Sequence, residues 1–463
     1  MQYDLIIIGS GPGGYVAAIR ASQLGMKTAI IEKAEVGGIC LNWGCIPTKA
    51  LLKSVQVFEY AQHAAEYGIE ISGGVKPNIK KIVERSRGVA AGMSKGVDYL
   101  LKKNKIDIIQ GFGKLAAKNT VEVSADSKEK QTVTAKNIIL ATGARSRVLP
   151  SMPIDGKKII GYRQALVPEN CPKSMVVVGS GAIGSELAYF YNAMGTQVTL
   201  VEYLPNIVPL EDEDVSAQLS RSFRKAGIKI MTGASTESVD TSGDLCKVRI
   251  QSKKGTETVE CEVVLSAVGI SANIEGIGLE ELGIEVECGK IKVDKAYRTN
   301  VEGIYAIGDI INTQALAHVA SAEAIACVEK LAGLDVKPIN YNNIPGCTYT
   351  TPEIASVGYT EKAAIEKGYE VKVGKFPYTA SGKANAAGAR DGFVKLALDA
   401  KTDEVLGAHF IGANVTEMIG GIVMARNKGI KGVDIIKSIF PHPTMSEAIM
   451  EAATAAYGEV VHL

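Results

Sequence analysis

The stretch Asp4-Leu-Ile-Ile-Ile-Gly-Ser-Gly-Pro-Gly-Gly14 decides the fold of this 463-residue chain. An apolar strand runs directly into a Gly-x-Gly-x-x-Gly turn formed by Gly9, Gly11 and Gly14. After an expected helix, the strand Thr28–Glu32 ends in an acid 23 positions beyond Gly9. Such glycines let the backbone approach a pyrophosphate at a helix N-terminus, and the acid accepts hydrogen bonds from ribose hydroxyls. The complete unit predicts a dinucleotide-binding fold.

The same unit occurs a second time. Ser174-Met-Val-Val-Val-Gly-Ser-Gly-Ala-Ile-Gly184 repeats the strand and the glycine turn. In both copies a glycine lies 16 residues after the first glycine of the turn (Gly25 and Gly195), and an acid lies 23 residues after it (Glu32 and Glu202). The alternative is two chance glycine-rich turns. Two matched units in one chain indicate two bound dinucleotides.

Between the two copies, the segment Gly37–Lys49 carries Cys40 and Cys45 with four residues between them. Cysteines this close can bridge only if the backbone leaves regular helix, because their Cα atoms must come within roughly 7 Å. Gly44 makes that departure easy. A thiolate at a helix N-terminus is stabilised by the helix dipole, which makes it a competent redox sulfur. The segment therefore predicts a catalytic dithiol or disulfide, with two ordinary buried cysteines as the alternative.

The combination of the N-terminal fingerprint with Gly-Gly-x-Cys-x4-Cys-x3-Lys resembles the class I pyridine nucleotide–disulfide oxidoreductases, which are FAD flavoproteins. Within that family, Cys-Leu-Asn-x-Gly-Cys-Ile-Pro-Thr-Lys is most similar to the dihydrolipoamide dehydrogenase branch. Matching landmarks run from residue 4 to about 451. The resemblance implies an α/β fold with two Rossmann-like dinucleotide-binding domains and a C-terminal α+β dimerisation domain. The implied boundaries are 1–147 for the first FAD-binding segment, 148–271 for the NAD-binding domain, 272–343 for the second, central FAD-binding segment and 344–463 for the dimerisation domain.

The resemblance assigns FAD to the first glycine turn and a nicotinamide dinucleotide to the second. The residues that it implies for FAD come from the first turn, the dithiol segment and several strand and helix ends: Gly9, Gly11, Gly14, Glu32, Lys33, Gly38, Lys49, Gly113, Thr142, Gly143, Asp309 and Ala317. Those that it implies for the nicotinamide dinucleotide surround the second turn: Gly179, Gly181, Ile183, Gly184, Glu186, Glu202 and Gly269. In the family, the residue at Asp309 accepts a hydrogen bond from the ribityl chain.

Charge favours NAD over NADP in the second unit. Glu202 would repel a 2′-phosphate, and it would accept hydrogen bonds from a free 2′-hydroxyl. The following residues, 203–206, supply no arginine that could bind the phosphate. The plain alternative for Glu202 is a solvated strand end.

The end of the chain carries Phe440-Pro-His-Pro-Thr-Met-Ser-Glu447. The prolines fix the backbone beside His442, and Thr444 or Ser446 can cap the helix expected there. Glu447 lies where its carboxylate could orient the imidazole as a general base, although a surface histidine before a helix is the simpler alternative. In the family this sequence is the catalytic signature, and its histidine reaches the disulfide of the other subunit. The resemblance thus implies a homodimer in which no monomer has a complete active site.

The implied reaction is the oxidation of a protein-bound dihydrolipoyl group, with His442 as base, Cys40 as the attacked sulfur and Cys45 beside the flavin. The family pairs Lys49 with Glu186 near the flavin, whereas Glu186 alone could simply complement a helix N-terminus. The implied partner is the lipoyl arm of a 2-oxo acid dehydrogenase or glycine cleavage complex. Alternatives are a glutathione- or mycothione-type disulfide reductase, an NADH–quinone oxidoreductase, and a mainly structural role as a peripheral subunit.

Two features depart from the family pattern. Trp43, between the cysteines, stands where smaller residues are common, and it could shape the disulfide pocket differently. The helix expected after Ala317 is less acidic than in the family and lacks a glycine often seen there.

Composition narrows the classes of protein to which the chain could belong. Apolar residues make up 46% of the chain, and 51 basic residues nearly balance 50 acidic ones, which argues against an electrostatic role on nucleic acid or membrane. No apolar run approaches the ~20 residues of a membrane span. The N-terminus enters a strand at once, which leaves no room for a signal peptide. The six other cysteines have no metal-like spacing, so we expect no metal site and a cytoplasmic protein with reduced thiols.

Overall fold

The computed structural model describes residues 2–125 and 130–463. The chain forms two compact units. Unit 1 contains Met1–Leu51, Lys80–Arg147 and Ile270–Tyr341, and unit 2 contains Leu52–Ile79, Val148–Gly269 and Asn342–Leu463. Within the described residues, no helix is both long enough and apolar enough to cross a membrane.

Unit 1 is built on a mixed sheet in the order β3-β2-β1-β6-β5-β4, with β19 also paired to β6. The parallel strands are β1 (Tyr3–Ile8), β2 (Thr28–Glu32), β3 (Asp107–Gln110), β6 (Gln131–Leu140) and β19 (Ile304–Ala306). Two antiparallel strands, β4 (Phe112–Ala117) and β5 (Thr120–Ser124), extend the sheet beside β6. The central strands are apolar without alternation because parallel strands are covered on both faces.

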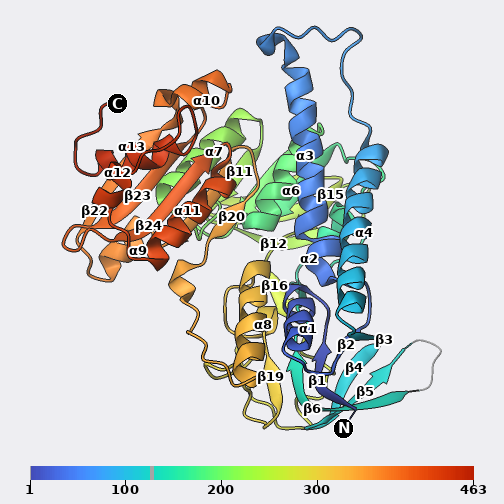
Figure 1. The fold of residues 1–463 in the computed structure, drawn as a ribbon. Coiled ribbons are helices and arrows are strands. Elements are labelled where there is room, and N and C mark those ends of the chain that lie inside the picture. The colour runs from blue at the N-terminus through green and yellow to red at the C-terminus, as the bar shows by residue number, and fades with distance from the viewer. Residues whose placement is uncertain (1, 126–129) are drawn as a thin grey trace. The chain divides into compact units, whose positions relative to one another are not determined.

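Helices cover this sheet and carry the dithiol segment. The helices α1 (Pro12–Gln23) and α8 (Ala317–Leu331) lie side by side (Figure 1). The dithiol segment forms α2 (Gly38–Trp43) and the beginning of α3 (Cys45–Gln62), and α4 (Ile79–Lys103) follows. Smaller elements of unit 1 are β7 (Ala144–Ser146), β16 (Ile270–Ala272), β17 (Val286–Glu287), β18 (Lys290–Ile291), η2 (Gly308–Ile310) and η3 (Tyr341–Asn343), of which η3 runs on into unit 2.

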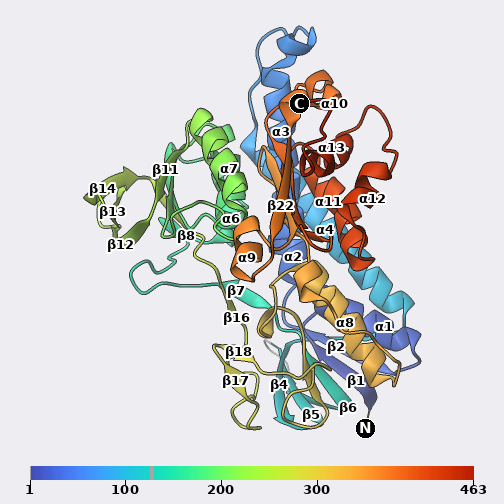
Figure 2. The ribbon, with the colours of Figure 1, turned by 90° about the vertical axis from the view of Figure 1, so that its left-hand side faces the viewer.

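The first part of unit 2 repeats the nucleotide-binding topology. Its parallel sheet has the order β11-β10-β9-β15-β8. The strands are β8 (Ile159–Ile160), β9 (Ser174–Val178), β10 (Gln197–Glu202), β11 (Lys229–Thr232) and β15 (Val263–Ser266), and the helices are α5 (Tyr162–Ala165), α6 (Ala182–Ala193) and α7 (Glu213–Lys225). An antiparallel ribbon of β12 (Ala234–Asp240), β13 (Cys246–Ser252) and β14 (Gly255–Cys261) projects from it (Figure 2).

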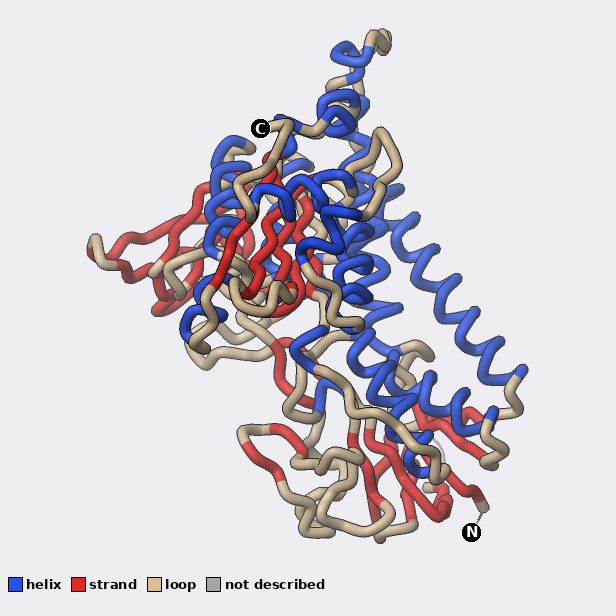
Figure 3. Tube along the Cα trace, turned by 60° about the vertical axis from the view of Figure 1, so that its left-hand side comes forward, coloured by secondary structure: helices blue, strands red, loops and turns tan. Residues whose placement is uncertain are grey.

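The last part of unit 2 is an antiparallel sheet in the order β20-β21-β24-β23-β22, with helices packed beside it (Figure 3). Its strands are β20 (Gly346–Thr348), β21 (Glu353–Gly358), β22 (Val371–Pro377), β23 (Phe393–Asp399) and β24 (Val405–Gly412). Its helices are α9 (Glu361–Glu366), η4 (Tyr378–Ala380), α10 (Gly382–Ala386), α11 (Val415–Asn427), α12 (Gly432–Lys437) and α13 (Glu447–Ala455); η1 (Ala64–Tyr67) follows α3. The mixed sheet of unit 1, the parallel sheet of unit 2 and this α+β region confirm the expected α/β fold class.

Candidate functional site

The first glycine turn is shaped to receive a ligand. A Cβ atom at Gly9 would lie 2.3 Å from the Ala141 carbonyl oxygen, and one at Gly14 would lie 1.9 Å from the Gly9 carbonyl oxygen. These two positions therefore admit only glycine. At Gly11, by contrast, no atom lies within 4 Å of the Cβ position. The middle glycine thus borders open space at the start of α1, where a pyrophosphate can approach unbonded N–H groups.

The second glycine turn has the same geometry. Cβ atoms at Gly179 and Gly184 would lie 2.4 Å from the Ala267 oxygen and 1.9 Å from the Gly179 oxygen, whereas Gly181 again borders open space. The backbone of the residue before each helix is also the same in both copies, with φ −64° and ψ −176°. The residues present therefore fit two dinucleotides.

A serine in each turn holds the acid at the end of the second strand. The Glu32 Oε2 atom accepts hydrogen bonds from Ser10 N (2.9 Å) and Oγ (2.7 Å), and Glu202 Oε2 accepts from Ser180 N (2.9 Å) and Oγ (2.6 Å). Each Oε1 atom accepts from the backbone N–H two residues further on. Neither serine belongs to the Gly-x-Gly-x-x-Gly pattern, so neither was predicted, although its identical place in both repeats was a usable signal.

The two cysteines of the dithiol segment form a disulfide. Cys40 and Cys45 are bonded with their Cα atoms 4.8 Å apart. Gly44 separates α2 from α3 with a non-helical backbone, as its sequence position predicted. Cys45 is exposed at the start of α3, and Cys40 is half-buried. The cysteines therefore lie at a helix N-terminus, where a thiolate is stabilised.

The dithiol segment packs directly on the first glycine turn. A Cβ atom at Gly38, where φ is 64°, would lie 2.6 Å from the Gly11 Cα atom. The Gly37 N–H donates to the Ser10 carbonyl oxygen (3.1 Å) and to its Oγ atom (3.2 Å). Only glycine allows this close approach. The dithiol segment and the first glycine turn are thus in direct contact within unit 1.

Asp309 lies in a turn that is held by a buried acid. Glu323, which is 0% exposed, accepts hydrogen bonds from Gly308 N (2.7 Å) and Tyr341 Oη (2.9 Å). Among the described residues, none donates a hydrogen bond to the Asp309 carboxylate. Burial raises the pKa of Asp309, and only the charge of Lys290 opposes it. An acceptor without a donor at this place fits a hydroxylated ligand chain. Glu323 has no recognisable motif, so the sequence did not reveal it.

Other residues predicted for FAD lie in the same unit. Thr142 and Gly143 are tied to Asn273: Thr142 Oγ1 donates to the Asn273 oxygen (2.6 Å), and Asn273 N donates to the Gly143 oxygen (2.8 Å). Gly113 lies on β4, where a Cβ would meet side chains of β1 and β2 at 3.2 and 3.3 Å. Lys33 lies over the Phe112 ring, and Ala317 is the first residue of α8.

The residues predicted for NAD lie in unit 2. Glu186 is 3% exposed on α6, and its Oε1 atom accepts from Tyr349 N (2.9 Å). Ile183 is partly exposed on the same helix, and Gly269 has φ 105°. Lys49 belongs to unit 1, so its pairing with Glu186 stays a prediction.

His442 and Glu447 form the expected pair. The His442 Nδ1 atom lies 2.9 Å from Glu447 Oε1, and the imidazole side chain is 78% exposed. Glu447 Oε2 accepts from Thr444 N (2.8 Å). Burial raises the pKa of Glu447, but the Thr444 amide and His442 outweigh it, so the net shift is downward. The carboxylate is therefore held ionised and fixes the ring.

The predicted helix cap is wrong. Ser446 makes no side-chain cap at α13, and Thr444 Oγ1 donates instead to the Pro441 oxygen (2.8 Å). The physical reason is that the Glu447 carboxylate itself binds the preceding backbone at Thr444 while holding His442.

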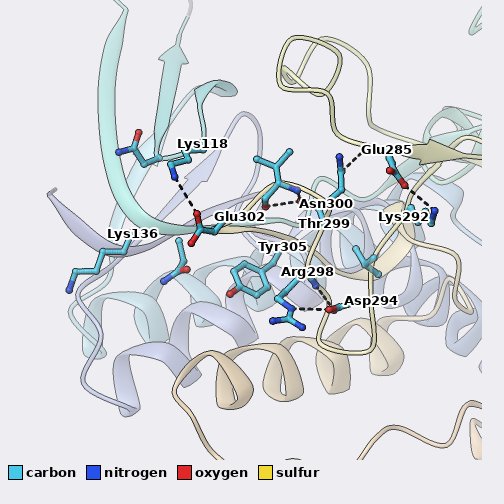
Figure 4. A pocket seen from close by; sticks show the side chains of 15 residues that line it. Lys118, Lys136, Glu285, Lys292, Asp294, Arg298, Thr299, Asn300, Glu302 and Tyr305 are labelled. Atoms are coloured by element: carbon cyan, nitrogen blue, oxygen red, sulfur yellow. Dashed lines mark hydrogen bonds and ion pairs between the residues drawn. The ribbon is translucent and has the colours of Figure 1, made fainter.

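Unit 1 also contains a surface pocket of about 970 Å³ (Figure 4). Six of its seven charged side chains form ion pairs with one another: Lys118 with Glu302 (3.3 Å), Lys292 with Glu285 (2.9 Å) and Arg298 with Asp294 (2.8 Å). The seventh, Lys136, pairs with Asp4 outside the lining (2.6 Å). None of the residues predicted for FAD lines it, so it is not part of the candidate site.

Comparison with known proteins identifies the family. Residues 3–324 match the pyridine nucleotide-disulphide oxidoreductases, and residues 344–453 match the dimerisation domain of the same group. The chain belongs to this family.

Similar proteins extend over the whole chain. Dihydrolipoyl dehydrogenases from Rhizobium etli and Bacillus subtilis are 48% and 43% identical, each covering 100% of this chain and 99% of their own length. The mitochondrial dihydrolipoyl dehydrogenase of Pisum sativum is 40% identical, with 100% and 93% covered. LpdA from Mycobacterium tuberculosis has a similar structure, with a TM-score of 0.89, 29% identity, and 97% and 98% of the chains covered.

Proposed function

We propose that the protein is a dihydrolipoyl dehydrogenase that oxidises protein-bound dihydrolipoyl groups through Cys40 and Cys45 and passes the electrons to NAD. The observation that carries the proposal is the Cys40–Cys45 disulfide, at a helix N-terminus and packed on the first glycine turn. Relatives that are 40–48% identical over the whole chain and bear this name support the choice of substrate.

The thiol chemistry uses His442 and the two cysteines. Because Glu447 holds Nδ1, the base is Nε2, which removes a proton from one substrate thiol. The resulting thiolate attacks Cys40 Sγ, the Cys40–Cys45 bond breaks, and its electron pair leaves on Cys45 Sγ at the α3 N-terminus. The second substrate thiol then loses its proton and attacks the substrate sulfur of the mixed disulfide, and the electron pair of the broken bond leaves on Cys40 Sγ. This step releases the oxidised, cyclic lipoyl disulfide and leaves both cysteines reduced.

In this proposal, FAD would be held by the first glycine turn together with Glu32, Thr142, Gly143 and Asp309. NAD would be held by the second glycine turn together with Glu202. Bound there, FAD would supply the two-electron acceptor for the reduced dithiol and the hydride donor for NAD. Glu202 selects NAD because its carboxylate would repel a 2′-phosphate.

The protein acts as a homodimer in which His442 serves the disulfide of the other subunit. The match of residues 344–453 to the family's dimerisation domain supports this assembly. The partner is the lipoyl arm of a 2-oxo acid dehydrogenase or glycine cleavage complex. Among the described residues, Cys171, Cys246, Cys261, Cys288 and Cys327 form no disulfide, which supports a cytoplasmic location where thiols stay reduced.

An anaerobic titration of the purified holoenzyme with dihydrolipoamide, followed by flavin absorbance, tests the proposal. We expect a long-wavelength thiolate-to-flavin band that NAD discharges and NADP discharges poorly. Cys40→Ser should keep FAD bound but lose thiol turnover. Failure of dihydrolipoamide to reduce the enzyme, together with rapid reduction by NADPH and turnover of glutathione disulfide, would move the protein to another disulfide reductase of the family.

A further inference from the structure

Helix α4 binds the backbone of the dithiol segment through three consecutive side chains. They donate hydrogen bonds to carbonyl oxygens of α2 and α3: Arg85 Nη1 to Ala50 (2.7 Å), Ser86 Oγ to Pro47 (2.8 Å) and Arg87 Nη1 to Asn42. About two α4 turns further on, Ser94 Oγ donates to the Val36 oxygen (2.6 Å). Side chains from one helix thus hydrogen-bond the backbone of the dithiol segment and its neighbours, from before Cys40 to beyond Cys45.

Arg87 is the member of this set that reaches the loop between the two cysteines. Its guanidinium carbon lies 4.0 Å from the centre of the Trp43 ring, and it donates to the carbonyl of the neighbouring Asn42. Trp43 is itself held, because its Nε1 atom donates to Glu35 Oε1 (3.0 Å). Trp43 is the only tryptophan in the chain. Trp43, which departs from the family pattern, therefore provides the ring on which Arg87 stacks.

The Asn42 peptide that Arg87 holds is also fixed from within the segment. The Asn42 Nδ2 atom donates to the carbonyls of Val36 and Gly38, both at 3.0 Å, and the residue is 3% exposed. Asn42 lies two residues from Cys40 and three from Cys45. The Arg87 guanidinium is thus bound to the four-residue loop that joins the two cysteines. A nearby cation favours thiolates, the form that reduction produces.

We propose that Arg87, seated on Trp43, is a positioning residue for the dithiol: it fixes the loop between the cysteines, and its charge favours the reduced pair over the disulfide. The inference deepens the proposed function, because it assumes that Cys40 and Cys45 are the redox pair. It does not depend on which dithiol is the substrate. Arg85 provides the matched comparison, since it carries the same charge on the same helix but binds Ala50, outside the cysteine loop.

The test is a thiol–disulfide equilibrium. The holoenzyme is incubated with known ratios of reduced to oxidised dithiothreitol, alkylated, and analysed by mass spectrometry for the Cys40/Cys45 state. Each turnover of this exchange breaks one protein disulfide, forms one dithiothreitol disulfide and moves two electrons and two protons. We expect Arg87→Met to require about a tenfold higher ratio for half-reduction, which is about 30 mV. Arg85→Met should stay within about twofold of the wild type.

Two further variants separate charge from stacking. Arg87→Lys keeps the charge but loses the planar contact, so we expect an intermediate midpoint. Trp43→Phe keeps a ring under the guanidinium and should stay near wild type, whereas Trp43→Leu should shift toward Arg87→Met. The pH at which the thiolate-to-flavin band appears should also rise in Arg87→Met but not in Arg85→Met.

Equal midpoints for Arg87→Met and Arg85→Met, or an unshifted Arg87→Met, would overturn the inference. If Arg87→Met fails to fold, the midpoints of Trp43→Leu and Trp43→Phe are compared instead. Equal midpoints for these two variants would show that stacking of Arg87 on the ring has no effect on the dithiol, which would also overturn the inference. Failure of the proposed function looks different: dihydrolipoamide would not reduce the enzyme, whereas dithiothreitol would still titrate the pair.

Discussion

At the scale of single residues, the same serine–carboxylate contact occurs in both glycine turns. Ser10 and Ser180 each donate two hydrogen bonds to an acid at the end of the neighbouring strand, with nearly equal distances in both units. A hydrogen bond to a charged group contributes about 1.5–3 kcal/mol. The serine therefore fixes the rotamer of the carboxylate before any ribose arrives, which lowers the ordering cost of binding.

Removing one serine should affect one cofactor only. We expect Ser180→Ala to raise the KM for NAD about tenfold, since a carboxylate that has lost its hydroxyl partner must be ordered on binding. Stopped-flow reduction of the flavin by dihydrolipoamide should be unchanged. Ser10→Ala is the matched variant, which should instead weaken FAD retention during gel filtration. A Ser180→Ala enzyme that loses flavin or slows in the thiol half-reaction would contradict the assignment of the second turn to NAD.

A second residue-scale prediction concerns Glu211, which precedes α7. Its Oε2 atom is enclosed without a hydrogen-bond partner among the described residues. Burial raises the pKa of this carboxyl from 4.5 to about 7, the Ser356 hydroxyl lowers it, and the Asp212 charge raises it further. Because the folded-state pKa lies above the unfolded one, the protonated carboxyl favours folding at low pH, and this contribution is lost as the pH rises through about 7.

Glu211→Gln should therefore stabilise the protein at high pH. We expect a gain of about 3 kcal/mol at pH 8 and under about 1 kcal/mol at pH 5, measured by urea unfolding. Glu213→Gln is the control, because Glu213 is exposed and pairs only loosely with Lys362 (3.4 Å). A gain that does not change between the two pH values would show that Glu211 is ionised in the folded protein throughout.

At the scale of elements, strands and turns followed from the sequence, but contacts distant in sequence did not. The strand Thr28–Glu32 and both glycine turns are where their patterns placed them. These features depend on local sterics and on strand periodicity, which the sequence displays directly. The binding of α4 side chains to the dithiol segment joins residues 35 to 58 positions apart, and a single sequence carries no signal for it. The helix-cap prediction failed because Glu447, which was read only as a partner for His442, also binds the backbone.

The contact between α7 and β23 is a second feature that only the structure reveals. Lys395 on β23 binds three acids: Asp212 Oδ1 (2.8 Å), Asp214 Oδ2 (2.9 Å) and Glu361 Oε2 (2.7 Å). Lys395 and Asp212 are each 3% exposed. Burial opposes the charge of Lys395, but the three acids outweigh it, so its pKa is raised. Within unit 2, this cluster connects the nucleotide-binding part to the dimerisation part.

Removing the lysine from this cluster should lower the stability of the protein. We expect Lys395→Met to lower the free energy of unfolding by about 3–5 kcal/mol, because it leaves the buried Asp212 charge without its partner. Adding Asp212→Asn should recover part of that loss in a double-mutant cycle. Lys229→Met, which removes an exposed ion pair with Glu257, should cost at most about 1 kcal/mol. Equal losses for the two lysines, measured by thermal unfolding, would argue against a buried charge pair.

At the scale of the whole molecule, the proposed active site divides its groups between two chains. The disulfide lies in unit 1, whereas His442 lies in the part of unit 2 that matches the dimerisation domain, with its imidazole largely exposed. An exposed, carboxylate-oriented histidine suits a base that acts on a neighbouring subunit. In a twofold dimer, each chain then supplies a dithiol to one site and a base to the other.

Complementation between inactive chains tests this division directly. Cys40→Ser and His442→Ala should each be inactive alone with dihydrolipoamide. In a hybrid of the two, one site combines both defects, while the other combines an intact dithiol from one chain with an intact His442 from its partner. Random mixing makes half of the dimers hybrids with one of two sites intact, so co-expression should restore about a quarter of wild-type activity. If His442 instead served its own chain, every site in the hybrid would carry one defect and the mixture would stay inactive. The double variant co-expressed with wild type is the control, because the intersubunit arrangement then leaves both hybrid sites defective.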